Sequence, residues 1–263
     1  MFSLSDGKPI AKTDESRPEI LFIDDSDPSD QSASEDYDQE WSDGNDEKMT
    51  VWESRAKLIP LPDLTTRFIE YIAGPSGSGK STIAADLATQ FRKVFPRHKI
   101  YIMSRTDASN DPAYSKLHPI QIPIDESLIE DPIDLTKEIT EAGCLIIFDD
   151  CNTIHNDKIK REVEKIMADG MEIGRKLNCN MIITSHLVIP NEKKFARTVM
   201  NELQMLTVFP RSGASQQIRY ALKQHFGLDN NQIEGILHLK SRWVRISKSY
   251  PQYVMYDHGA YIL

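Results

Sequence analysis

A glycine-rich turn between an apolar segment and an amphipathic helix constrains this chain more than any other feature. Residues 74–81 read GPSGSGKS and match the pattern G-x-x-x-x-G-K-[ST]. Residues 67–73 have the apolar character of a strand, and residues 79–95 carry apolar residues at helical spacing until Pro96 ends the pattern. A phosphate-binding loop needs this setting, because the motif connects a strand directly to a helix. The sequence therefore predicts an α/β protein.

The residue types in this turn predict a site for the phosphates of a nucleotide. Glycines let successive backbone N–H groups point inward, and the N-terminus of the following helix adds a partial positive charge. We expect Lys80 to reach the β- and γ-phosphates, Ser81 to offer its hydroxyl to Mg²⁺, and Thr82 to lie near the α-phosphate. A glycine-rich turn without a ligand is the alternative. The expected nucleotide-binding residues are Gly74, Pro75, Ser76, Gly77, Ser78, Gly79, Lys80, Ser81 and Thr82.

A second apolar segment ends in two acids and predicts the metal side of such a site. Residues 144–148 read CLIIF, a fully apolar strand of the kind found inside parallel sheets, and Asp149 and Asp150 follow directly. We expect Asp149 to orient water on Mg²⁺, beside Ser81, and Asp150 to orient and deprotonate the attacking water. Many P-loop hydrolases carry Glu at the second position, so the shorter Asp150 must reach further. Ordinary solvated acids at the end of a strand are the alternative.

A third apolar strand, residues 181–184, leads into Ser185 and His186. In P-loop ATPases whose sheet contains an additional strand, a polar residue at this point senses the γ-phosphate. Ser185 or His186 is expected to do so, and we include His186 among the catalytic candidates, although an ordinary polar role is equally open. No N-K-x-D sequence, which would read guanine, occurs near Asn191. This absence favours ATP as the nucleotide.

Strands and helices alternate along the rest of the body, which predicts a parallel sheet with right-handed crossovers. We expect a P-loop NTPase fold of the additional-strand, RecA- and FtsK-like type, with helices flanking the sheet. Further strands are expected at residues 99–103 and 203–209, with an inserted edge strand at 120–124. Further helices are expected at residues 134–141, 157–178 and 191–202. A small C-terminal extension is expected to contain two helices, at 215–227 and 230–239, and a hairpin of 243–246 and 253–256.

Charge divides the chain into a tail and a body. Residues 1–50 hold 15 acidic and 4 basic residues, a net charge of −11, whereas residues 51–263 hold 25 and 27, a net charge of +2. We expect residues 1–50 to be a disordered acidic tail, because they offer little to bury, and the apolar run 20–23 to be coil rather than a docking peptide. Residues 51–263 are expected to form the ATPase domain. Its core spans about 65–212 and its C-terminal extension about 213–263.

Neither a transmembrane helix nor a secretory signal peptide is expected from the sequence pattern. Its apolar runs are far shorter than the about 20 residues that cross a bilayer, and no basic start followed by an apolar core marks a signal peptide. Cys144, Cys151 and Cys179 are odd in number and lack CxxC spacing. Neither a disulfide framework nor a zinc site is therefore expected, and the thiols are read as small apolar residues in or near strands.

Together these segments resemble the FtsK–HerA superfamily, and within it the poxvirus-type DNA-packaging ATPases of nucleocytoplasmic large DNA viruses. The resemblance rests on the GPSGSGKS loop, the LIIFDD strand end and the stretch GMEIGRKLNCNMIITSH, and it covers about residues 65–212. It implies a ring of identical subunits that uses ATP and Mg²⁺ to move double-stranded DNA, without sequence preference, into a preformed capsid. It also implies a place in the virion or the host cytoplasm, with capsid or membrane-associated virion proteins as partners and no membrane insertion.

The resemblance further implies that an arginine from a neighbouring subunit completes the nucleotide site. The candidates are Arg197, Arg211 and Arg175. Arg197 precedes the last predicted strand, as in the family, but its spacing to Asn201 is longer. We include Arg197 among the catalytic residues and keep the other two open.

Two further features leave alternatives open. Lys240, Arg242, Arg245 and Lys248 surround Trp243, and they either follow a DNA backbone or form the solvated face of a hairpin. The P-loop also fits a small-molecule or nucleoside kinase, which needs an acceptor pocket and usually an arginine-rich lid. The sequence shows no clear lid motif, although residues 105–135 leave room for an insertion. A nucleotide-dependent scaffold that does not hydrolyse ATP is the third possibility, because an Asp stands where many hydrolases carry Glu.

Overall fold

The computed structural model describes residues 1–24, 51–63, 67–138 and 143–263. Its centre is a ten-stranded sheet whose first part is parallel. In spatial order the parallel strands are β8 (Ile120–Ile122), β7 (Lys99–Ser104), β9 (Cys144–Asp149), β10 (Cys179–Ser185), β6 (Ile69–Ala73) and β11 (Met205–Val208). Because β10 lies between β6 and β9, an additional strand separates the strand before the glycine loop from the strand that ends in two acids. The predicted fold class is confirmed.

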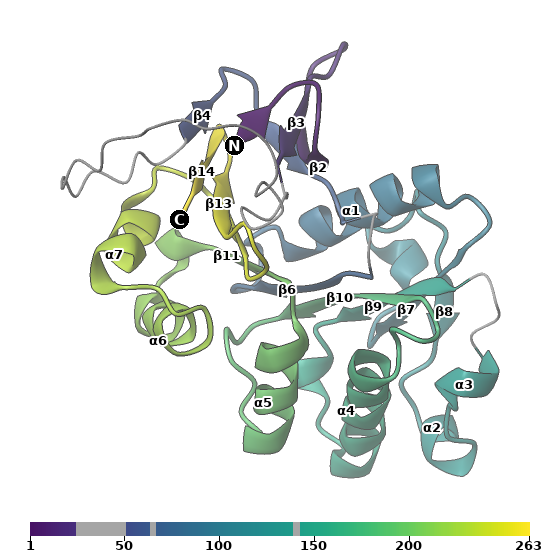
Figure 1. The fold of residues 1–263 in the computed structure, drawn as a ribbon. Helices are drawn as coiled ribbons and strands as arrows, with labels where there is room; N and C mark the ends of the chain where they lie inside the picture. Colours follow the sequence, from purple (N-terminus) through teal and green to yellow (C-terminus); the bar gives the residue numbers. More distant parts are fainter. Residues whose placement is uncertain (25–50, 64–66, 139–142) are drawn as a thin grey trace, which may run out of the picture.

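Helices cover both faces of this sheet (Figure 1). Helix α1 (Lys80–Val94) lies on one face, and α4 (Asp157–Glu172) and α5 (Lys193–Glu202) lie on the other. The apolar positions that predicted α1 are buried, and Asn156 caps the start of α4 by accepting hydrogen bonds from the backbone of residues 158 and 159. Shorter helical segments are α2 (Ser127–Glu130), α3 (Leu135–Glu138), η2 (Ala108–Asn110), η3 (Cys151–Thr153) and η4 (Pro210–Ser212).

The central strands are as buried as their composition predicts. Every residue of β6, β9 and β10 is buried, as expected for strands with helices on both sides. Cys144 and Cys179 lie in neighbouring strands with their sulfurs 3.7 Å apart, and Cys151 is buried just beyond β9. The reading of the thiols as small buried residues is therefore confirmed.

The C-terminal strands extend the central sheet instead of standing apart from it. The predicted hairpin forms as β12 (Val244–Ser247) and β13 (Tyr253–Tyr256), but β12 also pairs antiparallel with β11. The sequence reading missed β14 (Gly259–Ile262) and β4 (Val51–Glu53), which continue the sheet beyond β13. The two predicted helices form as α6 (Ser215–His225) and α7 (Asn230–His238), which pack on the face that carries α4 and α5.

A buried ion pair ties this extension to the core. Arg245 in β12 and Glu70 in β6 are 1% and 0% exposed, and their side chains are 2.7 Å apart at the closest charged atoms. Thr207, in the intervening strand β11, donates to the same carboxylate at 2.6 Å. The prediction that Arg245 lies on a solvated or DNA-facing surface is therefore wrong, because pairing of β12 with β11 turns this side chain inward.

The first 24 residues contradict the predicted disordered tail. A four-stranded sheet in the order β1–β3–β2–β5 joins β1 (Phe2–Ser3), β2 (Lys8–Thr13), β3 (Ile20–Ile23) and β5 (Leu58–Pro60). Its residues Ile10, Leu21 and Ile23 are buried in the same core as α1. Eleven of the fifteen acidic residues of the first fifty lie from Asp24 onward, so the average composition concealed these strands. Residues 25–50 lie outside the described part of the chain.

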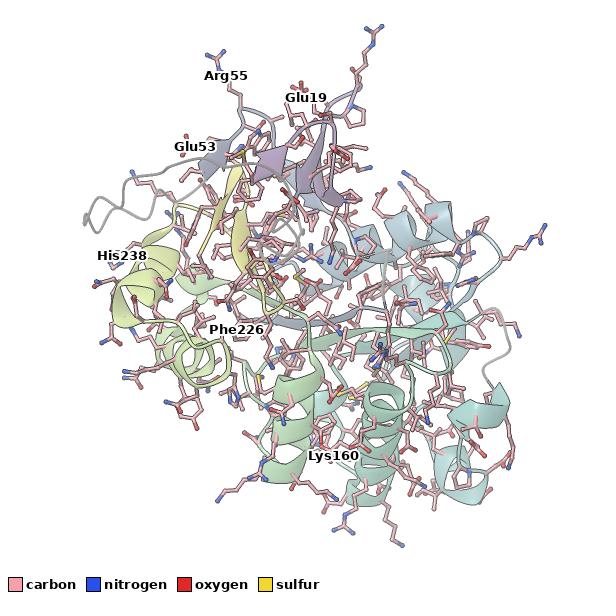
Figure 2. All side chains as sticks on the ribbon, viewed as in Figure 1. Glu19, Glu53, Arg55, Lys160, Phe226 and His238 are labelled. Carbon is pink, nitrogen blue, oxygen red and sulfur yellow. The ribbon has the colours of Figure 1, made fainter. Side chains whose placement is uncertain are left out.

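The small sheet lies at the end of the molecule opposite α4 and α5 (Figure 1). Figure 2 shows the side chains of Glu19 and Arg55 projecting outward there, and both residues are exposed. In the described ranges, no helix combines the length and the apolar character that crossing a bilayer requires.

Candidate nucleotide site

The glycine loop leaves the carboxyl end of β6 in a turn that only small residues allow. A Cβ on Gly74 would lie 2.5 Å from the ring of Phe209, and Gly77 and Gly79 have φ angles of +74° and +109°. The backbone N–H of Gly74 donates to the carbonyl of Ser185 at the end of β10, at 3.0 Å. The loop is therefore fixed against the neighbouring strand end, and α1 begins at its last residues.

Lys80 is buried within this loop beside an acid. Its side chain is only 5% exposed, and Nζ lies 3.3 Å from the carbonyl oxygen of Pro75 and 3.5 Å from Oδ1 of Asp150. A buried ammonium needs such partners, since desolvation without them is costly. The predicted phosphate-contacting lysine and the second predicted acid thus lie side by side.

The two acids are held together by the hydroxyl of Thr184 at the end of β10. Thr184 Oγ1 donates to Oδ1 of Asp149 at 2.9 Å and accepts from the backbone N–H of Asp150 at 2.9 Å. The carboxyl ends of β6, β9 and β10 are aligned by their register, which brings these groups to one edge of the sheet. The sequence placed the sensor at Ser185 or His186 and did not single out Thr184.

Asp150 adopts a backbone conformation that directs it toward the glycine loop. Its φ and ψ of 47° and 33° lie in the left-handed region, which is uncommon for residues other than glycine but tolerated by Asp and Asn. Its second oxygen lies 3.2 Å from Nε2 of His186, so Lys80 and His186 flank the carboxylate. The predicted catalytic residues Asp150 and His186 are therefore in direct contact.

Asp149 is buried and receives a second hydroxyl that the sequence did not reveal. Tyr114, from the irregular segment after β7, donates to Oδ1 of Asp149 at 2.8 Å. Burial raises the pKa of the Asp149 carboxyl, and the charge of Asp150 raises it further, whereas the hydrogen bonds from Tyr114 and Thr184 lower it. Burial and the charge of Asp149 also raise the pKa of Tyr114 well above its ordinary value. A cation beside Asp149 would favour its ionised form.

The predicted metal residues fit a magnesium ion by the chemistry of their oxygens. Ser81 stands in the first turn of α1, directly after Lys80, and Asp149 ends β9, directly before Asp150, whose carboxylate lies 3.5 Å from Lys80. Among the described residues, both hydroxyl bonds to Asp149 go to Oδ1, which leaves Oδ2 for a metal-bound water. Ser78 Oγ, within the loop, is buried without a hydrogen-bond partner in the described part of the chain.

Two open clefts flank the loop. One, of about 590 Å³, is lined by Pro75, Ser76, Gly77, Ser78, Phe209, Arg211, Ser212, Lys240, Arg242 and Asp257. The other, of about 290 Å³, includes Gly79 and Thr82 together with residues of β5. Thr82 is exposed on the first turn of α1, so its side chain is available to a ligand.

The three arginine candidates separate in space. Arg211, in η4, lines the first cleft of its own subunit. Arg197 is exposed on α5, and Arg175 is exposed in the turn that follows α4; neither lines a cleft beside the loop. Of the three, only Arg211 therefore lines a cleft beside the glycine loop within one subunit.

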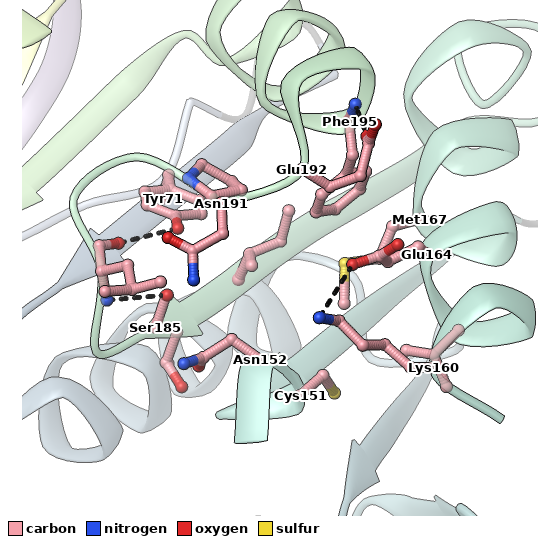
Figure 3. Close-up of a pocket in the computed structure, with 15 residues that line it drawn as sticks. Tyr71, Cys151, Asn152, Lys160, Glu164, Met167, Ser185, Asn191, Glu192 and Phe195 are labelled. Atoms are coloured by element: carbon pink, nitrogen blue, oxygen red, sulfur yellow. Dashed lines mark hydrogen bonds and ion pairs between the residues drawn. The ribbon is translucent and has the colours of Figure 1, made fainter. Parts of the chain in front are cut away.

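A separate small cavity of about 40 Å³ lies between β10 and the helices α4 and α5 (Figure 3). Ser185 faces this cavity, and its hydroxyl accepts from the backbone N–H of Leu187 at 3.0 Å, while Tyr71 donates to the carbonyl of Leu187 at 2.8 Å. Ser185 thus shapes the turn after β10, whereas Thr184 and His186 contact the two acids.

Comparison with known proteins places the chain in a viral family. No protein-family model matches it. The uncharacterised protein V3 of Sputnik virophage is 41% identical over 224 residues, which cover 85% of this chain and 88% of V3. The chain belongs to the family of this virophage protein.

Two solved structures resemble this chain in fold. B204, the DNA-packaging ATPase of Sulfolobus turreted icosahedral virus, matches with a TM-score of 0.51 and 12% identity over 74% of this chain and 98% of B204. TcpA, the pCW3 conjugation coupling protein, matches with a TM-score of 0.51 and 14% identity over 95% of this chain and 76% of TcpA. The predicted resemblance to FtsK–HerA-type packaging ATPases is thus confirmed at the level of the fold.

Proposed function

We propose that this protein is an ATPase that drives double-stranded DNA into a viral capsid as a ring of identical subunits. The observation that carries the proposal is the convergence of Lys80, Asp149 and Asp150, from the glycine loop and the end of β9, at the carboxyl edge of the sheet. The likeness in fold to B204, whose name describes DNA packaging, and the viral relative V3 support the choice of substrate.

In this proposal, different residues of the chain bind the phosphates, bind the metal ion and activate the attacking water. The loop amides and Lys80 bind the phosphates, and Ser81 and Asp149 hold Mg²⁺, which neutralises phosphate charge when bound. Asp150 accepts a proton from the attacking water, and His186, at 3.2 Å, fixes the orientation of its carboxylate. DNA would be contacted through its phosphates, without reading sequence. The proposal also includes assembly into a ring, a capsid partner and an arginine supplied to the site by the neighbouring subunit.

The test is phosphate release by the full chain from ATP and Mg²⁺, with and without duplex DNA. We expect turnover that duplex DNA increases and that Lys80→Ala abolishes. Lys93→Ala is the matched control, because Lys93 is exposed near the end of the same helix. Turnover that survives in Lys80→Ala would overturn the site, and turnover indifferent to DNA would overturn the motor. Release that requires a nucleoside acceptor would favour a kinase, and tight ATP binding without release would favour a scaffold.

A further inference from the structure

The phosphate loop is held from outside by an arginine from the far end of the chain. Arg242 donates from Nε to the carbonyl of Ser78 at 2.9 Å and from Nη2 to the carbonyl of Gly77 at 3.1 Å. A guanidinium can make both bonds at once because its N–H groups form a rigid planar fork, which a lysine lacks. The contact spans 164 residues of sequence, so it links the loop to the segment that leads into β12.

The backbone that carries the Arg242 side chain is itself held by hydrogen bonds. Its N–H donates to the carboxylate of Asp257, in the turn between β13 and β14, at 2.9 Å. The N–H of Asp257 donates to the hydroxyl of Ser241 at 3.0 Å, and Ser241, only 1% exposed, donates to the carbonyl of Trp243 at 2.6 Å. The arginine is therefore aimed at the loop by a network within the C-terminal strands.

The same segment gives the cleft a positive character. Arg242 and Lys240 line it together with Arg211, and Asp257 is the acid among the lining residues. Asp257 is engaged by the backbone of Arg242, so the guanidinium remains directed at the loop. A cleft with this balance favours an anionic ligand such as a triphosphate.

We propose that Arg242 is a positioning residue for the phosphate loop, and that the C-terminal strands β12–β14 are thereby part of the nucleotide site. Holding the carbonyls of Gly77 and Ser78 outward keeps the amides of the same turn directed inward, toward the phosphates. Triphosphate binding and the Arg242 contacts reinforce each other, because both need the same loop conformation. This inference rests on the nucleotide site proposed above.

The test is direct ATP binding, by calorimetry, to the full chain without turnover. We expect Arg242→Gln to weaken ATP binding roughly tenfold, since one charge-assisted hydrogen bond contributes about that factor. Arg242→Lys should be weakened almost as much, because it keeps the charge and loses the fork. Lys93→Gln is the matched control: it removes an exposed cation from the last turn of α1 that lines neither cleft beside the loop, so the ATP affinity of this variant should stay within about twofold of the original.

Hydrogen exchange supplies a second readout that does not depend on nucleotide. The loop amides of residues 77–79 should exchange faster in Arg242→Gln, while the amides of β9 keep their protection, which also shows that the variant is folded. Unchanged ATP affinity in Arg242→Gln, or full affinity in Arg242→Lys, would overturn the positioning role. Absence of ATP binding by the unmodified protein would instead overturn the proposed function.

Discussion

Removing one partner of the buried pair of Arg245 and Glu70 should destabilise the protein strongly. Arg245 donates three hydrogen bonds to the Glu70 carboxylate, from Nε at 3.0 and 3.1 Å and from Nη2 at 2.7 Å, and Thr207 adds a fourth at 2.6 Å. With both partners almost fully excluded from water, Arg245→Met leaves a carboxylate buried with one hydroxyl as its partner. Breaking a buried pair in this way costs about 3–5 kcal/mol in the free energy of unfolding.

Urea unfolding measures this cost. With an m-value of about 3 kcal/mol/M or slightly more for a chain of this size, the midpoint should fall by roughly 1 M or more. Tryptophan fluorescence and far-ultraviolet circular dichroism should give coincident transitions, which supports two-state treatment. Arg219→Met is the matched control: Arg219 also makes a two-pronged pair, with Glu234, but on the surface, so its loss should barely move the midpoint.

The double variant separates the cost of a buried, unpaired charge from the cost of altered packing. Replacing both charges, as Glu70→Leu with Arg245→Met, removes the stranded charge and should recover most of the lost stability, because a buried ion pair and an apolar pair of similar volume differ little in net free energy. The coupling in the double-mutant cycle should therefore be large. A single Arg245→Met variant that costs less than about 1 kcal/mol, or a double variant whose cost is the sum of the single costs, would refute the reasoning.

Three further outcomes are expected. Tyr114→Phe removes one hydroxyl from Asp149, so the Mg²⁺ concentration at half-maximal turnover should rise roughly tenfold, and a titration in which it does not move would contradict the role. Asp150→Asn should lower turnover by a factor of about 10² or more while ATP still binds, and normal turnover would exclude Asp150 as the base. Burial lowers the pKa of His98, which stacks on Phe95, so the unfolded chain binds this proton more tightly than the folded chain does. The free energy of unfolding should therefore fall as the pH drops below the ordinary histidine pKa of 6.5. A nuclear magnetic resonance titration that gives His98 a pKa at or above 6.5 would contradict this.

The predicted elements that the structure reproduces are those with a strong local signal. Helix α1 carries its apolar period within one segment, and β9 and β10 are short apolar runs that end in polar residues. The glycine motif fixed the order of strand, loop and helix, because only that order presents the loop amides to phosphate. Local pattern and global fold agree at these places, which is why sequence reasoning sufficed.

Long-range pairing explains most of what the sequence concealed. Strand β2 pairs with β5, more than 40 residues further along the chain, and its apolar residues are buried only because α1 lies beneath them. In the same way, the sequence suggested that Arg245 is a solvated cation, because its burial against Glu70 depends on the pairing of β12 with β11. Neither pairing leaves a periodic signal in the segment itself, so composition was the only guide, and the composition of residues 1–50 is dominated by the acids beyond residue 23.

The residues of the site also differ in how visible they are in the sequence. Some would touch the nucleotide, and others only keep those residues in place. Lys80, Asp149 and Asp150 stand in recognisable motifs because phosphate and metal chemistry dictate their types and spacing. Tyr114 and Arg242 have no such constraint, because any segment that brings a hydroxyl to Asp149 or a guanidinium to the loop carbonyls would serve. In this protein the hydroxyl comes from the irregular segment after β7, and the guanidinium comes from the segment that leads into β12. A supporting shell can therefore be found only from the folded geometry, and substitutions in it should alter affinity and metal dependence before they abolish turnover.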